Sequence, residues 1–394
     1  MLRRICLLIG LAFLPGVAGL TGCGFFPPLN KCTSNCTTTT TSDFAYVANT
    51  ATNKTSIAGF SLTTTTTAAT STTAATSTLT LAVTPGSAYS LSYTPTALAI
   101  TPGNKYLYVG ALTGGIYLYA INSNGSITLQ NNSQPVASGS IVSAMKVDST
   151  GAWLIVANAS LSTTKAVMTV FSIASTTGLL TSSGNLTVST AGASNRMVIA
   201  PSNTSVYVTL STGGTEAFTF NAATGVLGDV GNVATLSVAN ADLGVTTDPN
   251  SVYTFVTETG TGGIRVFKIG TNSGLTEVSG SPFATEVGPS AVVVDSSGSY
   301  VYVTNRTSNT ISGYVLAANG TLTTISSSPY NTGTNPVDIA EDSSGKYVGV
   351  VCNGGGQDLE MYSFDATTGG QLDPAANATT GTDPTLPIAI AMTH

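Results

Sequence analysis

"YVYVTNRTSNTISGYVLAANGTLT", residues 300–323, carries the clearest pattern in this chain. Alternating aromatic and β-branched residues flank an Arg-Thr-Ser-Asn turn, and a second turn, Ala-Asn-Gly, precedes another such run. Alternation with a period of two predicts strand, hairpin, strand, turn and strand. A single antiparallel pair is only marginally stable in water, so other strands must cover these faces.

The tetrad Tyr-Val-Thr-Asn at residues 302–305 has counterparts along most of the chain. The last residues of these tetrads are Asn49, Ala111, Asn158, Leu210, Glu258, Asn305 and Asn353. Successive differences between these positions are 62, 47, 52, 48, 47 and 48 residues. The long first interval holds a Thr/Ala/Ser-rich insertion, residues 63–80, which we expect to be a loop. Each repeat reads as four strands, and four-stranded units repeated radially are propeller blades.

The two ends of the repeat array complete each other. Short apolar segments precede the tetrads, and they begin at Pro95, Ile141, Arg196, Leu243, Pro289 and Pro336. A last such segment, residues 384–391, has no tetrad after it, while the first tetrad, residues 44–49, has no such segment before it. We therefore predict an all-β, seven-bladed β-propeller over residues 44–394, with four antiparallel strands per blade. The C-terminal strand closes the ring in blade one.

The N-terminal residues have the pattern of a bacterial lipoprotein signal. A basic start and a short apolar run within residues 1–22 end in Leu-Thr-Gly-Cys, which resembles the lipobox and predicts acylation of Cys23. Residues 23–43 form a Cys/Thr-rich tether, in which Cys32 and Cys36 could form a disulfide. The alternative is ordinary secretory cleavage. Gly24 in place of Asp favours an outer-membrane or cell-surface location after export across the inner membrane, with the protein attached to the membrane by its lipid.

Composition excludes several classes of protein. Charged residues make up 8% of the chain and the net charge is −6, with no basic stripe, so we expect no nucleic-acid partner. The cysteines lack zinc-site spacing, and serine-nucleophile and nucleotide-binding signatures are missing. We expect no metal and no cofactor, and a monomer. Cys352 lies in a Val-rich strand, where we expect a buried, inert thiol.

The tetrads, the Asp-x-x-Gly turns before several of them and the Gly-x-Leu-Thr segments after some of them resemble the lactonase family of seven-bladed propellers. That family includes bacterial 6-phosphogluconolactonase-like proteins. The resemblance spans residues 44–394 and implies the propeller fold, with lactone hydrolysis as one activity. It also implies a Pro-Arg-His start to one inner strand and an acid after a nearby tetrad. Here the first motif reads Asn-Arg-Met at residues 195–197, so only Arg196 matches, and Glu258 is a substitute for the acid.

Residues that start an inner strand or end a tetrad should gather at one mouth of the channel. Polar residues at such positions are Asn49, Asn158, Arg196, Asp242, Glu258, Asn305, Arg306, Asn335 and Asn353. Of these, we predict ligand-binding roles for Arg196, Asp242, Glu258, Asn305, Arg306 and Asn353. Arg196, Asp242 and Glu258 are also the catalytic candidates. A structural alternative stays open, in which Arg196 is neutralised by Asp242 or Glu258 and the asparagines only tie down turns.

Three functional hypotheses follow. The leading one is a lipid-anchored cell-envelope propeller that binds a sugar acid, a lactone or a protein on its channel face without catalysis. The alternative is a lactone hydrolase with a rearranged site around Arg196, Asp242 and Glu258. The single histidine, His394, lies at the last position, where we expect a frayed terminus. A third hypothesis is surface adhesion through edges and loops.

Overall fold

The computed structural model describes residues 37–51, 54–67, 76–160, 162–260, 263–365, 368–381 and 386–394. Two compact units are distinguished, and the larger one, residues 39–65 and 77–394, is the propeller. The smaller one, residues 1–38 and 66–76, lies almost wholly outside the described residues. The signal peptide and Cys23, Cys32 and Cys36 also lie outside them. The domain boundaries predicted at residues 22 and 43 therefore stay predictions.

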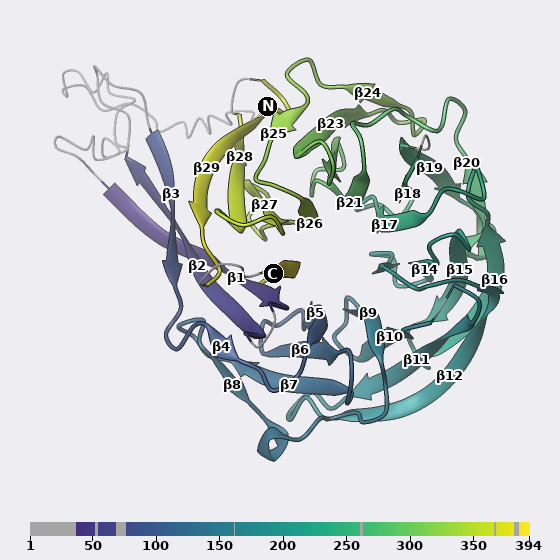
Figure 1. Ribbon diagram of the computed structural model, residues 1–394, viewed down its shortest axis with the longest axis horizontal. Helices are drawn as coiled ribbons and strands as arrows, with labels where there is room; N and C mark the ends of the chain where they lie inside the picture. Colours follow the sequence, from purple (N-terminus) through teal and green to yellow (C-terminus); the bar gives the residue numbers. More distant parts are fainter. Residues whose placement is uncertain are drawn as a thin grey trace, which may run out of the picture. The chain divides into compact units, whose positions relative to one another are not determined.

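The described residues form seven sheets arranged in a ring (Figure 1). From the channel outward, blade one is β30 (Pro387–Met392), β1 (Thr37–Asn49), β2 (Ser56–Thr67) and β3 (Thr76–Val83), with β4 (Tyr89–Ser90) against β2. Blade two is β5 (Pro95–Ile100), β6 (Tyr106–Ala111), β7 (Ile116–Ile121) and β8 (Ile127–Leu129). Blade three is β9 (Val142–Val147), β10 (Trp153–Asn158), β11 (Lys165–Ile173) and β12 (Leu180–Ala191). Blade four is β13 (Met197–Ile199), β14 (Ser205–Thr209), β15 (Thr215–Asn221) and β16 (Val226–Val233).

The remaining three blades repeat this order. Blade five is β17 (Asp242–Thr247), β18 (Tyr253–Glu258), β19 (Gly263–Ile269) and β20 (Leu275–Glu277). Blade six is β21 (Pro289–Val294), β22 (Tyr300–Asn305), β23 (Thr310–Leu316) and β24 (Leu322–Thr324), with β25 (Tyr330–Asn331) against β23. Blade seven is β26 (Pro336–Glu341), β27 (Tyr347–Cys352), β28 (Leu359–Phe364) and β29 (Leu372–Ala378). Two short 3-10 turns, η1 (Asn131–Ser133) and η2 (Thr271–Ser273), lie in the connections.

The ring closes as predicted. Strand β30 pairs antiparallel with β1, so that Val47 faces Ile390 and Ala45 faces Met392. Asp43, which is 1% exposed, accepts hydrogen bonds from the hydroxyls of Thr393 and Ser343 and so joins the last strand to blade seven. Closure matters because it removes the unpaired strand edges that an open array would leave.

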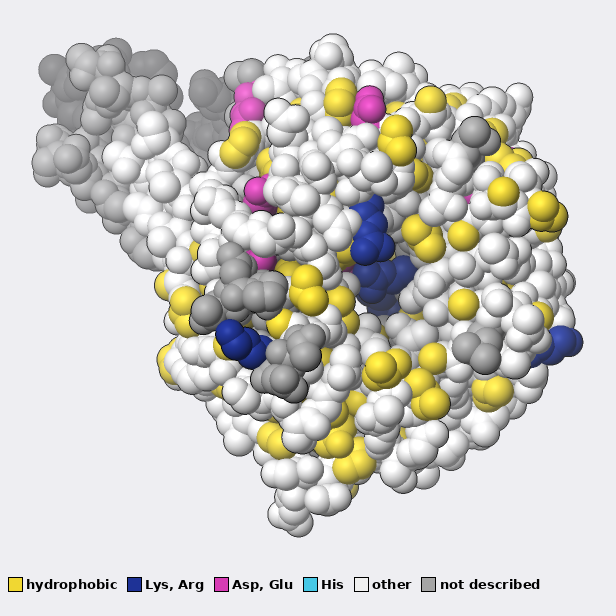
Figure 2. Space-filling view, viewed as in Figure 1, with side chains coloured by type: hydrophobic (Ala, Val, Ile, Leu, Met, Phe, Trp, Pro, Cys, Tyr) yellow, Lys and Arg dark blue, Asp and Glu magenta, His cyan; other side chains and the backbone are white. Residues whose placement is uncertain are grey.

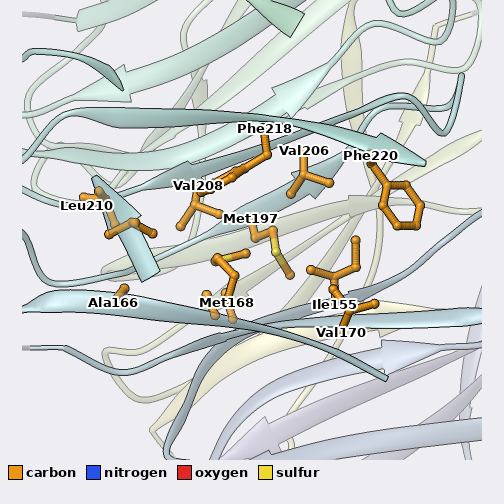
Figure 3. Packing of buried hydrophobic residues seen from close by; sticks show 13 residues of the cluster. Ile155, Ala166, Met168, Val170, Met197, Val206, Val208, Leu210, Phe218 and Phe220 are labelled. Carbon is orange, nitrogen blue, oxygen red and sulfur yellow. The ribbon is translucent and has the colours of Figure 1, made fainter. Parts of the chain in front are cut away.

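Packing between neighbouring blades buries the apolar residues of the alternating pattern. Figure 3 shows Met168 of β11 and Met197 of β13 meeting between blades three and four, with Val208 and Phe218 around them. All four are almost fully buried. Comparable clusters lie between the other blades. The apolar face of each blade is therefore buried against the next blade. An isolated hairpin has no such burial.

The tetrad tyrosines of four blades join each of these blades to the next one. The hydroxyl of Tyr302 donates to the carbonyl of Gly370, at 2.7 Å, in the turn between the two outer strands of blade seven. Tyr46, Tyr108 and Tyr207 make equivalent bonds to the turns of blades two, three and five. Gly370 has φ +78°, and a Cβ there would lie 2.3 Å from the ring of Tyr300. Only glycine fits this turn.

The Asp-x-x-Gly turns are stabilised by their own aspartates, as the sequence indicates. Asp295 Oδ1 accepts from the backbone amides of Ser299 and Tyr300, at 2.8 and 2.6 Å. Asp148, Asp248 and Asp342 do the same in their turns. The expectation of a loop over residues 63–80 is wrong at its ends, because β2 continues to Thr67 and β3 begins at Thr76. Threonine is β-branched and favours extended backbone.

The described residues contain no helix with the length and hydrophobicity of a membrane span. Within the same ranges, no group of three or more His, Cys, Asp or Glu side chains could hold a metal ion. Cys352 is buried and free, and burial raises the pKa of its thiol to about 12. This thiol is therefore protonated and inert, as predicted.

Candidate functional site

A ring of seven residues surrounds one mouth of the channel. Six of the inner strands have a bulge near their start, which leaves one or two residues out of the ladder. The corresponding position in blade four is Arg196, just before β13. The ring consists of Thr96, Ser143, Arg196, Leu243, Ser290, Val337 and Ile388, and it lines a cavity of about 520 Å³. We call this cavity the upper mouth.

Arg196 reaches across the channel from blade four. Its Nη2 donates to the carbonyl oxygens of Val337 and Ile388, each at 3.2 Å, on blades seven and one. Both acceptors are residues that the bulges leave out of the ladder, so their carbonyls are free for the side chain. Asp338 Oδ1 lies 3.6 Å from the same nitrogen. Nε and Nη1 form no hydrogen bond with any described residue, so three of the five guanidinium donors are available.

A second arginine lies at the rim of the upper mouth. Arg306 is exposed, and its Nε donates to Asn335 Oδ1 at 2.6 Å. Arg306 also lines the cavity, together with Asn353, whose amide donates to the carbonyl of Pro387 at 2.8 Å. None of the described residues that line this mouth is an acid. The mouth is therefore cationic in a chain of net charge −6, and Figure 2 shows Lys and Arg side chains gathered in the central hollow.

The structure does not bring Asp242 and Glu258 to Arg196. Asp242 faces Glu258 across the β17–β18 ladder, so both side chains lie on one face of blade five, toward blade four. They are 1% and 0% exposed and do not line the upper mouth. Glu258 pairs with Arg265 at 3.1 Å, and Arg265 pairs with Glu277 at 2.8 Å. We call Asp242, Glu258, Arg265 and Glu277 the blade-five charge cluster.

The predicted neutralisation of Arg196 by Asp242 or Glu258 is therefore wrong, since its partner is Asp338 of blade seven. The reason is the alternation of side chains along a strand, which directs Asp242 into the interface between blades and Arg196 into the channel. Sequence reasoning missed Arg265 and Asp338. A charged residue inside the apolar segment Ile264-Arg265-Val266-Phe267 was the available signal for the first.

Burial gives Asp242 an unusual protonation equilibrium. Loss of water raises its pKa to about 7, and the nearby Glu258 carboxylate adds to this, although a hydrogen bond from Thr215 opposes it. Thr215 Oγ1 donates to Oδ2 at 2.5 Å, while Oδ1 has no hydrogen-bond partner. A carboxyl group with a pKa near neutrality is typical of a general base. This one is enclosed between two blades and does not reach the upper mouth.

The tetrad asparagines Asn158 and Asn305 form hydrogen bonds with the following strand of their own blades. Asn305 is fully buried, and its amide is hydrogen-bonded to Thr310 and Ser312 of the following strand. Asn158 donates to the carbonyl of Val167. Of the predicted ligand-binding residues, Arg196, Arg306 and Asn353 line the upper mouth, whereas Asp242, Glu258 and Asn305 do not.

His394 lies at the opposite end of the channel and is not frayed. Its backbone amide donates to Asn104 Oδ1 at 2.7 Å, and its carbonyl accepts from Asn104 Nδ2 at 2.5 Å. It lines a cavity of about 380 Å³ where the inner strands end. The histidine is thus held in place, but the length of the channel separates it from the upper mouth.

Comparison with known proteins supports the family resemblance. Residues 274–386 match the model of a family described as "Lactonase, 7-bladed beta-propeller". No curated protein matches the chain significantly. A candidate 6-phosphogluconolactonase from Bacteroides uniformis superimposes with a TM-score of 0.69 at 16% identity, over 90% of this chain and 100% of its own. The periplasmic gluconolactonase of Pseudomonas aeruginosa gives 0.67 at 16% identity, over 90% and 99%. At these identities the two structures show a shared fold, and the match over residues 274–386 supports the resemblance to the propeller lactonases.

Proposed function

We propose that this lactonase-like seven-bladed propeller binds a small sugar acid or sugar lactone in its upper mouth, through Arg196 and Arg306. The observation that carries the proposal is a cavity with two arginines and no acid among its described lining residues, in an acidic chain. The cavity volume of about 520 Å³ is in the range of small-molecule sites. Such a site favours an anionic ligand, because arginine forms charge-assisted hydrogen bonds with anionic oxygens.

Arg196 is prepared for this role before any ligand arrives. Its bonds to Val337 and Ile388 hold the guanidinium across the channel, so little side-chain entropy is lost on binding. Nε and Nη1 remain free to donate single hydrogen bonds to an anionic ligand, while both paired edges of the guanidinium include the engaged Nη2. Asp338 offsets part of the positive charge from below, which lowers the cost of keeping the arginine inside the channel without removing its free donors.

Lactone hydrolysis is a second candidate function, favoured by the family match. In this reaction water adds to the lactone carbonyl, the ring C–O bond breaks, and the product carries a carboxylate and a hydroxyl. Arg196 or Arg306 would stabilise the negative charge that develops on the carbonyl oxygen. No described residue lining the mouth is a carboxylate or histidine that could act as a base, so the attacking water would lose its proton to solvent.

Binding is tested by calorimetric titration with D-gluconate. We expect wild-type binding to weaken about tenfold to a hundredfold in Arg196→Met and in Arg306→Met, because each loses charge-assisted hydrogen bonds. Lys268→Met is the matched control, since Lys268 is an exposed cation on β19 that does not line the mouth. Equal gluconate affinity in the two arginine variants and the wild type, or no wild-type binding at millimolar gluconate, would contradict the proposal.

Catalysis is tested separately, by acid release from D-glucono-1,5-lactone after subtraction of the uncatalysed rate. Release above that rate in the wild type, lost in Arg196→Met and kept in Lys268→Met, would establish a lactonase. If the wild type binds gluconate but does not release acid from the lactone faster than the uncatalysed rate, the protein binds its ligand without hydrolysing it.

We also propose that the protein is exported and attached to a membrane by a lipid. The lipobox sequence ending at Cys23 supports export and attachment to the outer membrane or cell surface through a lipid. A binding site on a propeller anchored in this way would face small molecules outside the cytoplasm.

A further inference from the structure

The channel continues below Arg196 and contains a second cation. Two further cavities, of about 310 and 380 Å³, follow the upper mouth toward the end of the inner strands. Arg196 and Asp338 line the first, His394 lines the second, and Lys146 and Glu341 line both. We call these two cavities the lower channel.

Lys146 has no partner in the described part of the chain. It lies on β9, the inner strand of blade three, and its side chain is exposed to the space inside the channel. It forms no hydrogen bond and no ion pair with the residues that the structure describes. The channel walls remove water from the ammonium and thereby lower its pKa, Arg196 lowers it further, and Asp338 partly opposes this.

The acids around the lower channel are engaged elsewhere. Asp338 faces Arg196 and accepts from the amide of Ile390 at 3.1 Å. Asp342 accepts from the amides of its own turn, including that of Tyr347 at 2.7 Å. Burial and the repulsion of Asp295 raise the pKa of Glu341 to about 7, so this group is substantially protonated at neutral pH. No carboxylate of the described lining is thus committed to Lys146.

We infer that the lower channel is a second anion site, in which Lys146 holds a small oxyanion such as phosphate or a carboxylate. A cation in an enclosed space is unfavourable when the nearest carboxylate, Asp338, is already paired with Arg196, and an anion entering from solvent supplies a direct partner. Arg196 adds attraction from above. Loss of water and the charge of Lys146 lower the pKa of His394, although Asp43 and a hydrogen bond to the Ile100 backbone oppose this, so a neutral imidazole adds no charge to the site.

This site goes beyond the proposed function and shares Arg196 with it. The upper mouth is lined by Arg306 and the bulge ring, whereas Lys146 does not line it. Arg306 lines neither cavity of the lower channel. Variants can therefore separate the two sites.

The test is calorimetric titration with inorganic phosphate. We expect Lys146→Met to weaken phosphate binding about tenfold to a hundredfold, and Lys146→Arg to keep most of the affinity, because it keeps the charge. Lys268→Met should bind like the wild type. Acetate titrated in the same variants shows whether a carboxylate is also accepted, and thermal melting confirms that each variant is folded.

Arg306→Met distinguishes the two proposals. We expect it to weaken gluconate binding and leave phosphate binding unchanged, while Lys146→Met does the reverse. Phosphate affinity equal in Lys146→Met and the wild type, or no wild-type binding at millimolar phosphate, would overturn the lower site and leave the upper one standing. Loss of gluconate binding with phosphate binding intact in the same protein would support the lower site.

Discussion

The guanidinium of Arg196 and the carbonyl oxygen of Ile388 lie 3.2 Å apart across the channel, although 192 positions separate the two residues in the chain. Ile388 belongs to the strand that closes the ring, and its carbonyl is free because β30 has a bulge there. The same nitrogen bonds Val337 of blade seven. One side chain therefore links three blades and separates the upper mouth from the lower channel.

Arg196→Lys should lose these links while keeping the charge. An ammonium cannot reproduce the planar fork that contacts two carbonyls and leaves further donors free. We expect a loss of about 1 kcal/mol in the free energy of unfolding, measured with urea. Arg306→Lys is the control, since Arg306 is exposed and its replacement should change stability by less than about 0.5 kcal/mol. Equal stability of Arg196→Lys and the wild type would show that the carbonyl contacts contribute nothing.

Tyr302→Phe tests the bonds between blades. The change removes the hydroxyl that donates to Gly370 at 2.7 Å and leaves this carbonyl with only the long hydrogen bond from the Tyr330 hydroxyl, at 3.5 Å. We expect a loss of about 1–2 kcal/mol of unfolding free energy. Tyr300→Phe is a matched control, because the Tyr300 hydroxyl makes no hydrogen bond within the described ranges. If both variants unfold at the same urea concentration, the tetrad tyrosines act through ring packing alone.

Asp242→Asn should remove a pH-dependent part of the stability. Burial raises the pKa of Asp242 from an ordinary value of 3.8 to about 7 in the folded protein. An acid with a raised pKa stabilises the fold most below the unfolded value, and this contribution is lost as pH rises through 7. The wild type should therefore lose stability between about pH 4 and pH 7 relative to Asp242→Asn, which mimics the protonated acid. Thermal melting across this range measures the difference, and parallel pH profiles would contradict the raised pKa.

Deletion of residues 387–394 should abolish soluble folding. The deletion removes β30, exposes the edge of β1 and uncovers Tyr46 and Val47, which are fully buried. We expect no cooperative melting transition and aggregation on expression. A truncated chain that melts as cooperatively as the full one would show that the last strand is dispensable for closure.

Cys23→Ala tests the proposed anchor. If Cys23 is acylated, the variant should leave the membrane fraction or accumulate with its signal peptide uncleaved, as measured by fractionation and gel mobility. Replacement of Cys352 by Ser, as a control, should leave fractionation unchanged. A Cys23→Ala protein that stays with membranes at the mature size would refute the lipid anchor.

The fold could be predicted because its determinants are local and repeated. Alternation along each strand, turn residues at fixed offsets and tetrads about 47 positions apart are all legible in the sequence. Even the closure by β30 follows from matching an unpaired strand at each end. Arg196 and Arg306 could be placed at one mouth for the same reason, since equivalent positions of a repeat share one face of the ring.

The partners of these residues depend on the tertiary structure alone. Whether Arg196 meets Asp242 or Asp338 is decided by which side chains point into the channel and which blades face each other across it. Lys146 is an ordinary strand residue in the sequence. Only its unpaired position inside the channel makes it a candidate anion-binding residue. The sequence thus determined the seven blades and their order. The ring decided which charges meet, because electrostatic pairing acts across space over a few ångströms, between residues that can lie more than a hundred positions apart in the chain.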